Sequence, residues 1–179
     1  MRIILCGVPC VGKSTVGKLL ADRVGYRFFD FDSEIEAHFK NYITFLHQKW
    51  WTGHSYRHNT RVVLQEILTE NPDNIVIAMP PSGLMDFYWR IIKQDEGLVT
   101  IALRDRAENI LKRLTFYDDY SELMASPVNE ENEHRYLESI RDDMEYFGRT
   151  LSRAKVQYKM NGKSAGEVAE DLQQLILGS

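Results

Sequence analysis

The sequence of 179 residues contains only two cysteines and no long apolar run. Cys6 and Cys10 are too few for a disulfide scaffold, and no second Cys or His pair completes a metal site with them. We therefore expect two reduced thiols, as in a cytoplasmic protein. No apolar stretch reaches the ~18 residues of a membrane span. The first apolar segment is interrupted too early for a secretory leader, so we expect neither feature.

An excess of basic residues is also lacking. Lys and Arg number 22 and Asp and Glu number 26, which gives a formal net charge of −4. This balance provides no basic surface of the kind that binds duplex nucleic acid or an anionic membrane, so we expect neither partner. The apolar share of 44% is close to the globular average, which excludes a disordered chain. A chain of this length predicts one domain over residues 1–179.

Strand and helix patterns alternate along the chain. Short continuous apolar runs predict buried strands at 3–6, 26–29, 75–79, 98–103 and 156–160. Helical spacing of apolar residues predicts helices at about 13–23, 33–39, 56–68, 84–93, 107–114, 135–153 and 165–177. This alternation predicts an α/β domain with a parallel sheet and helices on both faces. The stretch 115–134 has no clear period and predicts a long mobile loop with short helical pieces.

A phosphate-binding loop follows the first predicted strand. Residues 7–14 read GVPCVGKS, which fits G-x-x-x-x-G-K-[ST] without a gap. Glycines allow the tight turn, and the helix that follows directs its N–H groups at an anion. Lys13 is expected to reach the β- and γ-phosphates, and the Ser14 hydroxyl to bind Mg²⁺. The predicted ATP-binding residues of this segment are Gly7, Cys10, Val11, Gly12, Lys13, Ser14 and Thr15. The alternative is a glycine turn beside an ordinary lysine.

Further motifs resemble those of shikimate kinase and its relatives among the small P-loop kinases. The stretch 29–36 resembles the D-x-D…I-E segment of that family, and 53–57 resembles its G-x-x-x-F-R segment. Arg113 lies before the long loop, and 161–163 follows the last predicted strand. The similarity covers nearly the whole chain in order and spacing. It implies a three-layer P-loop kinase fold with a five-stranded parallel sheet of order 2-3-1-4-5 and a mobile lid at about 115–134.

The resemblance also implies roles for individual residues. Asp30 joins Ser14 at Mg²⁺, and Asp32 joins Lys13 as a catalytic residue that contacts the acceptor. Arg57 is expected to pair with an acceptor carboxylate, since its planar guanidinium suits bidentate pairing. The remaining implied contacts are Arg61 and Ser82 at the acceptor and Arg113 and Gly162 at adenine. The alternatives remain open: Asp30 and Asp32 as a solvated helix start, and the two arginines of 56–68 as a solvated face paired with Glu66 or Asp residues.

Three departures from the family pattern concern the acceptor. The family has three glycines after the third strand, whereas this chain has Pro80, Pro81 and Ser82. Proline has no N–H, so two backbone donors are lost, which argues for an altered substrate. No Lys or Arg lies between Arg113 and Arg135, and the predicted lid is acidic. The second substrate-binding arginine of the family has no clear match, and the candidates are Arg135, Arg141 and Arg149.

Together these observations predict a kinase that uses ATP and Mg²⁺ to phosphorylate a hydroxyl of a small metabolite, with shikimate as the default acceptor. One alternative is a kinase with a gluconate-like, nucleoside-like or cationic acceptor. Another is an ATP-binding regulatory module whose acidic lid docks a protein partner, although no other feature of the sequence supports such a partner.

Overall fold

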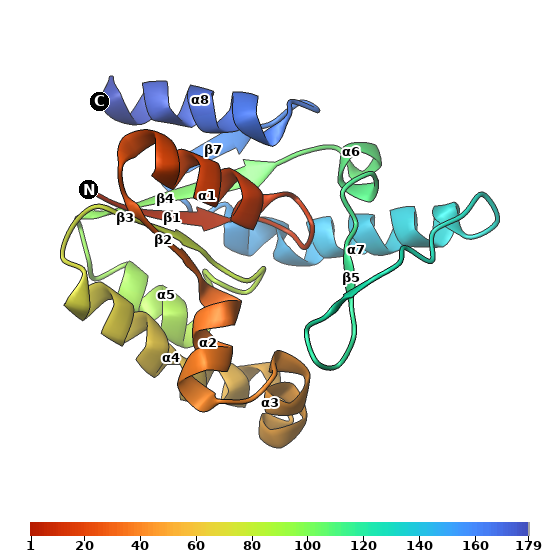
Figure 1. Cartoon of the computed structure of the whole chain (residues 1–179), viewed down its shortest axis with the longest axis horizontal. Coiled ribbons are helices and arrows are strands. Elements are labelled where there is room, and N and C mark those ends of the chain that lie inside the picture. Colours follow the sequence, from red (N-terminus) through yellow and green to blue (C-terminus); the bar gives the residue numbers. More distant parts are fainter. Residues whose placement is uncertain (179) are drawn as a thin grey trace.

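The computed structural model describes residues 1–178 and places the five predicted strands in one parallel sheet (Figure 1). The strands are β1 Arg2–Cys6, β2 Arg27–Asp30, β3 Ile75–Ala78, β4 Leu98–Arg104 and β7 Val156–Lys159. Their order is β2-β3-β1-β4-β7, which confirms the predicted order with β7 as the fifth strand. The central strand β1 pairs Ile3 with Val76 on one side and with Val99 on the other.

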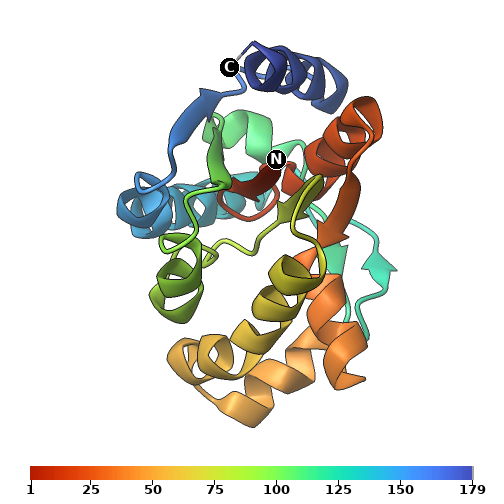
Figure 2. The same ribbon diagram turned by 90° about the vertical axis from the view of Figure 1, so that its left-hand side faces the viewer.

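Helices cover both faces of the sheet. Helices α1 Lys13–Val24 and α8 Ala165–Leu177 pack together on one face, while α5 Asp86–Ile92 and α7 Glu133–Leu151 lie on the other (Figure 2). Helix α4 Gly53–Glu70 packs against α5, and α6 Ala107–Leu111 against α7. Two covered faces explain why the central strands are continuously apolar. Ile3, Ile4 and Leu5 are fully buried.

The region between β2 and α4 is more helical than the sequence predicts. Helix α2 Phe31–Phe39 begins directly after β2, two residues earlier than predicted. Helix α3 Ile43–Trp50 was not predicted, because two of its four apolar residues are aromatic and Trp50 packs on residues of neighbouring helices. The ring of Trp50 meets Phe39 at 5.0 Å between centroids, and His47 stacks on Tyr56 at 3.8 Å. These contacts fix α3 against α2 and α4.

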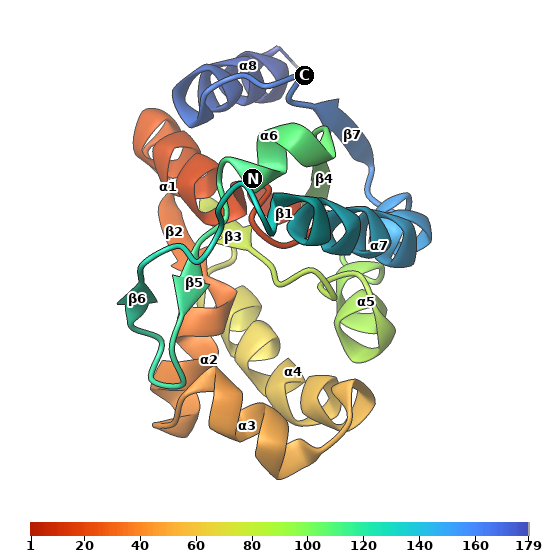
Figure 3. The same cartoon turned by 90° about the vertical axis from the view of Figure 1, so that its right-hand side faces the viewer.

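The predicted loop 115–134 contains a β-hairpin, and the prediction of short helical pieces there is wrong. Strand β5 Phe116–Tyr117 pairs antiparallel with β6 Leu123–Met124. The Asp118 carboxylate accepts hydrogen bonds from the backbone N–H groups of Tyr120 and Glu122, both at 2.9 Å, which favours a tight turn over a helix. The hairpin lies beside α2 (Figure 3). Its mobility stays a prediction.

Two further features bear on the class of protein. Cys6 is a buried free thiol, and Cys10 is a partly exposed one. Within residues 1–178, none of the helices combines the length and the apolar character needed to cross a bilayer.

Candidate active site

The loop between β1 and α1 forms a cradle whose shape depends on its glycines. A Cβ on Gly7 would lie 2.7 Å from Cγ1 of Val11 and 2.9 Å from the carbonyl oxygen of Leu103, so no larger residue fits there. Cys10 adopts a left-handed backbone with φ of +56°, a conformation that favours glycine. A conformation that most residues avoid is thus retained in the centre of the loop, which is typical of functional sites.

Lys13, the first residue of α1, folds back onto this loop. Its Nζ donates to the carbonyl oxygens of Gly7 at 3.1 Å and Val8 at 2.9 Å. Burial lowers the pKa of Lys13, while the negative charges of Asp32 and Asp30 act in the opposite direction. The ammonium group therefore lies within the cradle, with two carboxylates nearby.

A cavity of about 560 Å³ brings the predicted nucleotide residues together. The loop contributes Cys10, Gly12, Lys13, Ser14 and Thr15. The facing side contributes Asp30, Asp32, Pro80, Pro81 and, at one end, Arg113. The two prolines line the wall where backbone N–H groups were predicted to be missing. Gly7 and Val11 shape the loop and do not line the cavity, and Val11 is fully buried.

Asp30 and Asp32 reach this cavity because β2 runs directly into α2. Asp30 ends the strand, and Asp32 lies in the first turn of the helix. Burial raises the pKa of Asp32 to about 6, the charge of Asp30 adds to the shift, and the charge of Lys13 opposes it. A carboxyl with this pKa is mostly ionised at neutral pH and exchanges protons readily, as a general base does.

The oxygen atoms of Ser14 and Asp30 suit a magnesium ion. Both residues line the 560 Å³ cavity, where a hydroxyl and a carboxylate supply the hard donors that Mg²⁺ prefers. Among residues 1–178 there is no group of three His, Cys, Asp or Glu residues placed to hold a metal. Such a group is not required, because Mg²⁺ is commonly bound by one or two protein oxygens together with the phosphates of its substrate.

The far end of the cavity is organised by Asp105, which the sequence did not single out. Its carboxylate accepts a hydrogen bond from Arg113 at 2.7 Å and from the backbone N–H of Gly162 at 3.1 Å. Burial raises the pKa of Asp105, but hydrogen bonds from Asn109 and Arg113 outweigh it and hold the pKa below its usual value. Asp105 thus joins Arg113 to the turn after β7. Its position directly after β4 is the signal that was missed.

A second cavity, of about 510 Å³, adjoins the first and is acidic. It shares Ser14, Asp30, Asp32 and Tyr117 with the first cavity and adds Glu36 and Asp118. Within the described chain, no Lys or Arg lines this acidic cavity.

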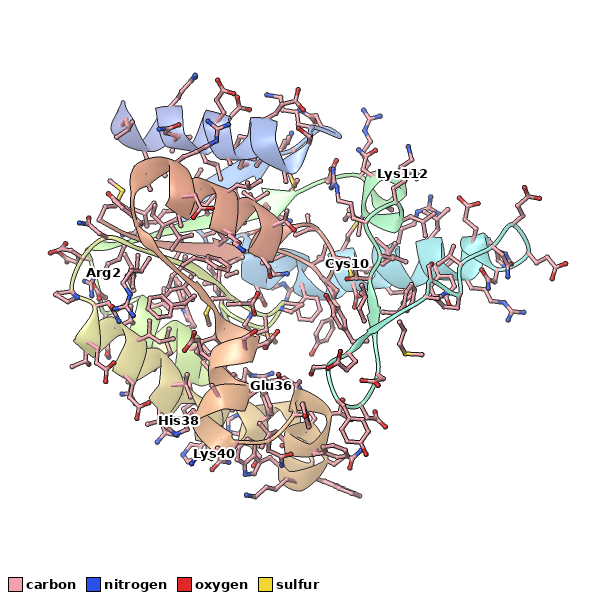
Figure 4. The ribbon with its side chains drawn as sticks, viewed as in Figure 1. Arg2, Cys10, Glu36, His38, Lys40 and Lys112 are labelled. Atoms are coloured by element: carbon pink, nitrogen blue, oxygen red, sulfur yellow. The ribbon has the colours of Figure 1, made fainter. Side chains whose placement is uncertain are left out.

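The hairpin contacts both sides of this region. Its tip reaches α2, where the Ser121 hydroxyl donates to Glu36 at 2.5 Å. Figure 4 shows Glu36 on α2 and Cys10 in the loop after β1, on the two sides that the hairpin segment bridges. The Cys10 sulfur lies 3.9 Å from the Thr115 hydroxyl.

The predicted acceptor residues do not all gather at these cavities. Arg57, Arg61 and Ser82 line neither cavity. Arg57 pairs with Asp86 at 2.7 Å instead. The Arg61 guanidinium donates to the carbonyl oxygen of His58 and lies 5.3 Å from the ring centre of Phe87.

The structure also shows the partners of several arginines for which the sequence left alternatives open. Of the alternative partners for these arginines, an Asp residue is found for Arg57, in Asp86, whereas Glu66 pairs with His38 at 3.0 Å. Arg141 pairs with Glu108 at 3.0 Å, and neither Arg135 nor Arg149 lines either cavity.

Comparison with known proteins agrees with this geometry. A family model described as shikimate kinase matches residues 9–176. The chain belongs to the shikimate kinase family. This membership confirms the resemblance that the motifs suggested.

Individual members of the shikimate kinase family show how far the similarity extends. The shikimate kinase of Salinibacter ruber is 33% identical over 115 residues, which cover 64% of this chain and 54% of that protein. The chain thus spans about half the length of that relative. The shikimate kinase from Acinetobacter baumannii, solved in complex with shikimate, is 27% identical with a TM-score of 0.73 and covers 99% of this chain and 93% of that chain. The shikimate kinase from Bacteroides thetaiotaomicron has a TM-score of 0.79 at 20% identity, covers 99% of this chain and 98% of that chain, and supports the fold alone.

Proposed function

We propose that this protein is an ATP- and Mg²⁺-dependent kinase that phosphorylates a hydroxyl of a small metabolite. The observation that carries the proposal is the shared cavity of Lys13, Ser14, Asp30 and Asp32 beside the phosphate loop. Phosphoryl transfer needs positioning and charge neutralisation more than covalent chemistry, and these residue types supply both. Membership of the shikimate kinase family supports the same reaction class.

Each of these residues has a separate role in the proposed phosphoryl transfer. Asp32 accepts the proton of the attacking hydroxyl, whose oxygen bonds to the γ-phosphorus as the bond to the β-phosphate oxygen breaks and ADP leaves. Lys13 and the N–H groups of the loop neutralise the charge on the transferred group. Ser14 and Asp30 would hold Mg²⁺, which would shield the phosphate charges. Arg113 lines the end of the cavity proposed for adenine, and Asp105 links it to the backbone N–H of Gly162, which does not line the cavity.

Shikimate is the first acceptor to test, because the solved Acinetobacter baumannii relative binds it. A kinase with a different acceptor is the second candidate, and the prolines at 80 and 81 favour it, since they line the cavity and donate no backbone hydrogen bond.

The test is ADP release from Mg²⁺-ATP with and without shikimate, with Lys13→Ala as the blank. Shikimate-dependent release that the Lys13 variant loses supports the first candidate. If ATP binds but shikimate does not increase ADP release, shikimate is excluded as the acceptor. The second candidate is then tested by measuring ADP release with a panel of other hydroxyl compounds. Nucleotide binding with no acceptor-dependent release across the panel overturns the kinase and leaves an ATP-binding regulatory module.

A further inference from the structure

The Asp105 carboxylate is completely enclosed by the protein. Its side chain is 0% exposed, and it lines neither the 560 Å³ cavity nor the acidic cavity. Its Oδ1 accepts hydrogen bonds from the backbone N–H of Arg106 at 2.9 Å, from Nδ2 of Asn109 at 2.8 Å and from the backbone N–H of Gly162 at 3.1 Å. Its Oδ2 accepts from Nη1 of Arg113 at 2.7 Å. The carboxylate is thus satisfied within the protein, so Asp105 acts on its neighbours and not on a ligand.

Arg113 connects this carboxylate to the nucleotide cavity. It lines the 560 Å³ cavity together with Lys13 and Ser14 of the phosphate loop. Both of its terminal nitrogens are engaged, Nη1 by Asp105 and Nη2 by the carbonyl oxygen of Lys163 at 3.2 Å. Two acceptors at separate nitrogens fix the plane of the guanidinium group. This arrangement leaves the flat face of the group for a ligand, and the face of an arginine stacks well on a planar ring.

The same carboxylate holds the turn that follows β7. The turn is closed by a hydrogen bond from the backbone N–H of Lys163 to the carbonyl oxygen of Met160 at 3.0 Å. Asn161 and Gly162 at its centre have φ of +52° and +78°, both in the left-handed region. The bond from the Gly162 N–H to Asp105 stabilises this conformation. Met160 lines the 560 Å³ cavity, so the turn supplies an apolar wall to it.

The attraction between Asp105 and Arg113 is strengthened by their burial. The side chain of Arg113 is 26% exposed and that of Asp105 is 0% exposed, so little water screens the 2.7 Å contact. An arginine released from this contact would lose its fixed plane and gain side-chain entropy. A ligand would then have to order the arginine on binding, which reduces affinity.

We propose that Asp105 is a positioning residue for the nucleotide base. It holds the face of Arg113 and the turn after β7 in place before the nucleotide binds, so that the base enters a site that is already ordered. The inference rests on the proposed function, which places the base at this end of the cavity. It assigns to Asp105 no contact with the nucleotide and no part in the transfer itself.

The experiment compares ATP with inorganic tripolyphosphate, which has the phosphates but no base. Asp105→Asn keeps the size of the side chain and removes its charge. In calorimetric titrations we expect its Kd for ATP to rise about tenfold, the value of one charge-assisted hydrogen bond, and its Kd for tripolyphosphate to change less than about twofold. Equal losses for both ligands, or an unchanged Kd for ATP, overturn the inference. So does an unaltered protein that binds ATP no better than tripolyphosphate.

Arg113→Lys provides a second variant, which still neutralises the buried carboxylate but lacks the planar face. We expect it to lose affinity for ATP and to keep its affinity for tripolyphosphate. The double variant with Asp105→Asn should bind ATP no more weakly than the weaker single variant, because both changes remove the same ordered contact. Additive losses overturn the inference, since they would show that the two residues act separately.

A matched control removes a charge from another ion pair of the same region. Glu108 of α6 pairs with Arg141 at 3.0 Å, and neither residue lines the 560 Å³ cavity. Because this pair is exposed, Glu108→Gln should leave Kd for ATP and for tripolyphosphate within about twofold of the unaltered protein. Circular dichroism of each variant checks that the fold is retained.

Turnover separates the inference from the proposed function. With a substrate that supports ADP release, Asp105→Asn should raise KM for ATP about tenfold and leave kcat and KM for the acceptor within about twofold. A fall in kcat with an unchanged KM for ATP overturns the positioning role. Failure of the proposed function looks different: ADP release is then absent for every acceptor, while the binding comparison of ATP with tripolyphosphate still decides the role of Asp105.

Discussion

The nucleotide half and the acceptor half of the active-site region are built in different ways. The nucleotide half consists of residues 7–15 and Arg113, and most of it is one continuous segment between a buried strand and a helix. The region proposed for the acceptor, or acceptor half, consists of the Pro80–Pro81 wall and the hairpin 116–124, while Arg57, also predicted for the acceptor, pairs with Asp86 outside both cavities. The nucleotide half keeps the family pattern, while the proposed acceptor half departs from it at the Pro80–Pro81 wall and in the acidic hairpin segment.

This difference shows where selection of the second substrate is encoded. A phosphate loop works through backbone N–H groups and one lysine, so it binds any nucleoside triphosphate in the same manner. The acceptor half works through side chains and through the presence or absence of backbone donors. Changes there alter which hydroxyl compound fits and leave the treatment of the phosphates intact.

We expect the largest loss of activity from a substitution in the nucleotide half. Lys13→Ala removes the cation that lies within the phosphate cradle. We expect acceptor-dependent ADP release to fall by about 10³-fold, as when a transition-state donor is removed. Lys18→Ala, an exposed lysine on the same helix, is the control and should stay within twofold. Equal losses in both variants would show that the location of Lys13 is unimportant.

Asp32 lines both cavities, and we expect its replacement to cause the second-largest loss of activity. Asp32→Asn cannot accept the proton of the acceptor, so we expect kcat to fall by about 10²- to 10⁴-fold. In the unaltered protein, kcat/KM should fall about tenfold per unit as pH drops below 6, because the carboxyl becomes protonated near its pKa of about 6. A rate that is flat between pH 5 and 7 would contradict the role as base.

The same pKa predicts a gain of stability in this variant. The folded protein holds a proton on Asp32 up to about pH 6, whereas an unfolded Asp releases it near pH 4. The free energy of unfolding therefore falls as pH rises from about 4 to 6 and stays lower above that range. Asp32→Asn removes this loss, so its melting temperature should exceed that of the unaltered protein by about 5–10 °C at pH 7.5 and lie close to it at pH 4. Calorimetric scans at the two pH values test the difference.

Replacing the Pro80–Pro81 wall by two glycines should make the acceptor half resemble the family pattern. The change restores two backbone N–H donors and removes two rings from the cavity wall. We expect kcat/KM for shikimate to rise about tenfold, the value of one or two good hydrogen bonds. Glycines also increase the entropy of the unfolded chain, so stability should fall by about 1 kcal/mol. No gain with shikimate would mean that these prolines do not limit the acceptor.

The smallest effect is expected at the hairpin. Ser121→Ala removes the hydrogen bond to Glu36 on α2, which is exposed to solvent. We expect KM for the acceptor to rise about threefold with kcat unchanged, in keeping with the loss of one such bond. Ser126→Ala, a hydroxyl on the same segment whose oxygen accepts only from the Val128 backbone at 3.3 Å, is the control. A constant KM for ATP in both variants would show that this contact of the hairpin affects the acceptor half and not the nucleotide half.

Local patterns in the sequence were sufficient to predict the sheet and the residues of the nucleotide half. Apolar runs located all five strands, and the strand-loop-helix arrangement placed Lys13 and Ser14 in one cavity with Asp30 and Asp32. These features depend on residues that are neighbours in the chain or that end adjacent parallel strands. Physical rules of pairing and crossover then fix their relation in space.

The acceptor half was predicted less well because it depends on contacts between distant residues. Asp86 lies 29 positions from Arg57, and no spacing rule links a residue of α4 to the start of α5. Helix α3 is held by aromatic contacts to α2 and α4 that no period along its eight residues reveals. The hairpin depends on the Asp118 turn, whose hydrogen bonds are decided in three dimensions.

The tip of the hairpin is anchored on α2 and α3. Ser121 and Tyr120 connect its tip to Glu36 of α2 and to the rings of Tyr42 and Phe45, while its base remains beside Arg113. Because Asp118 and Ser121 line the acidic cavity, separation of the tip from α2 would widen that cavity and leave the phosphate loop in place.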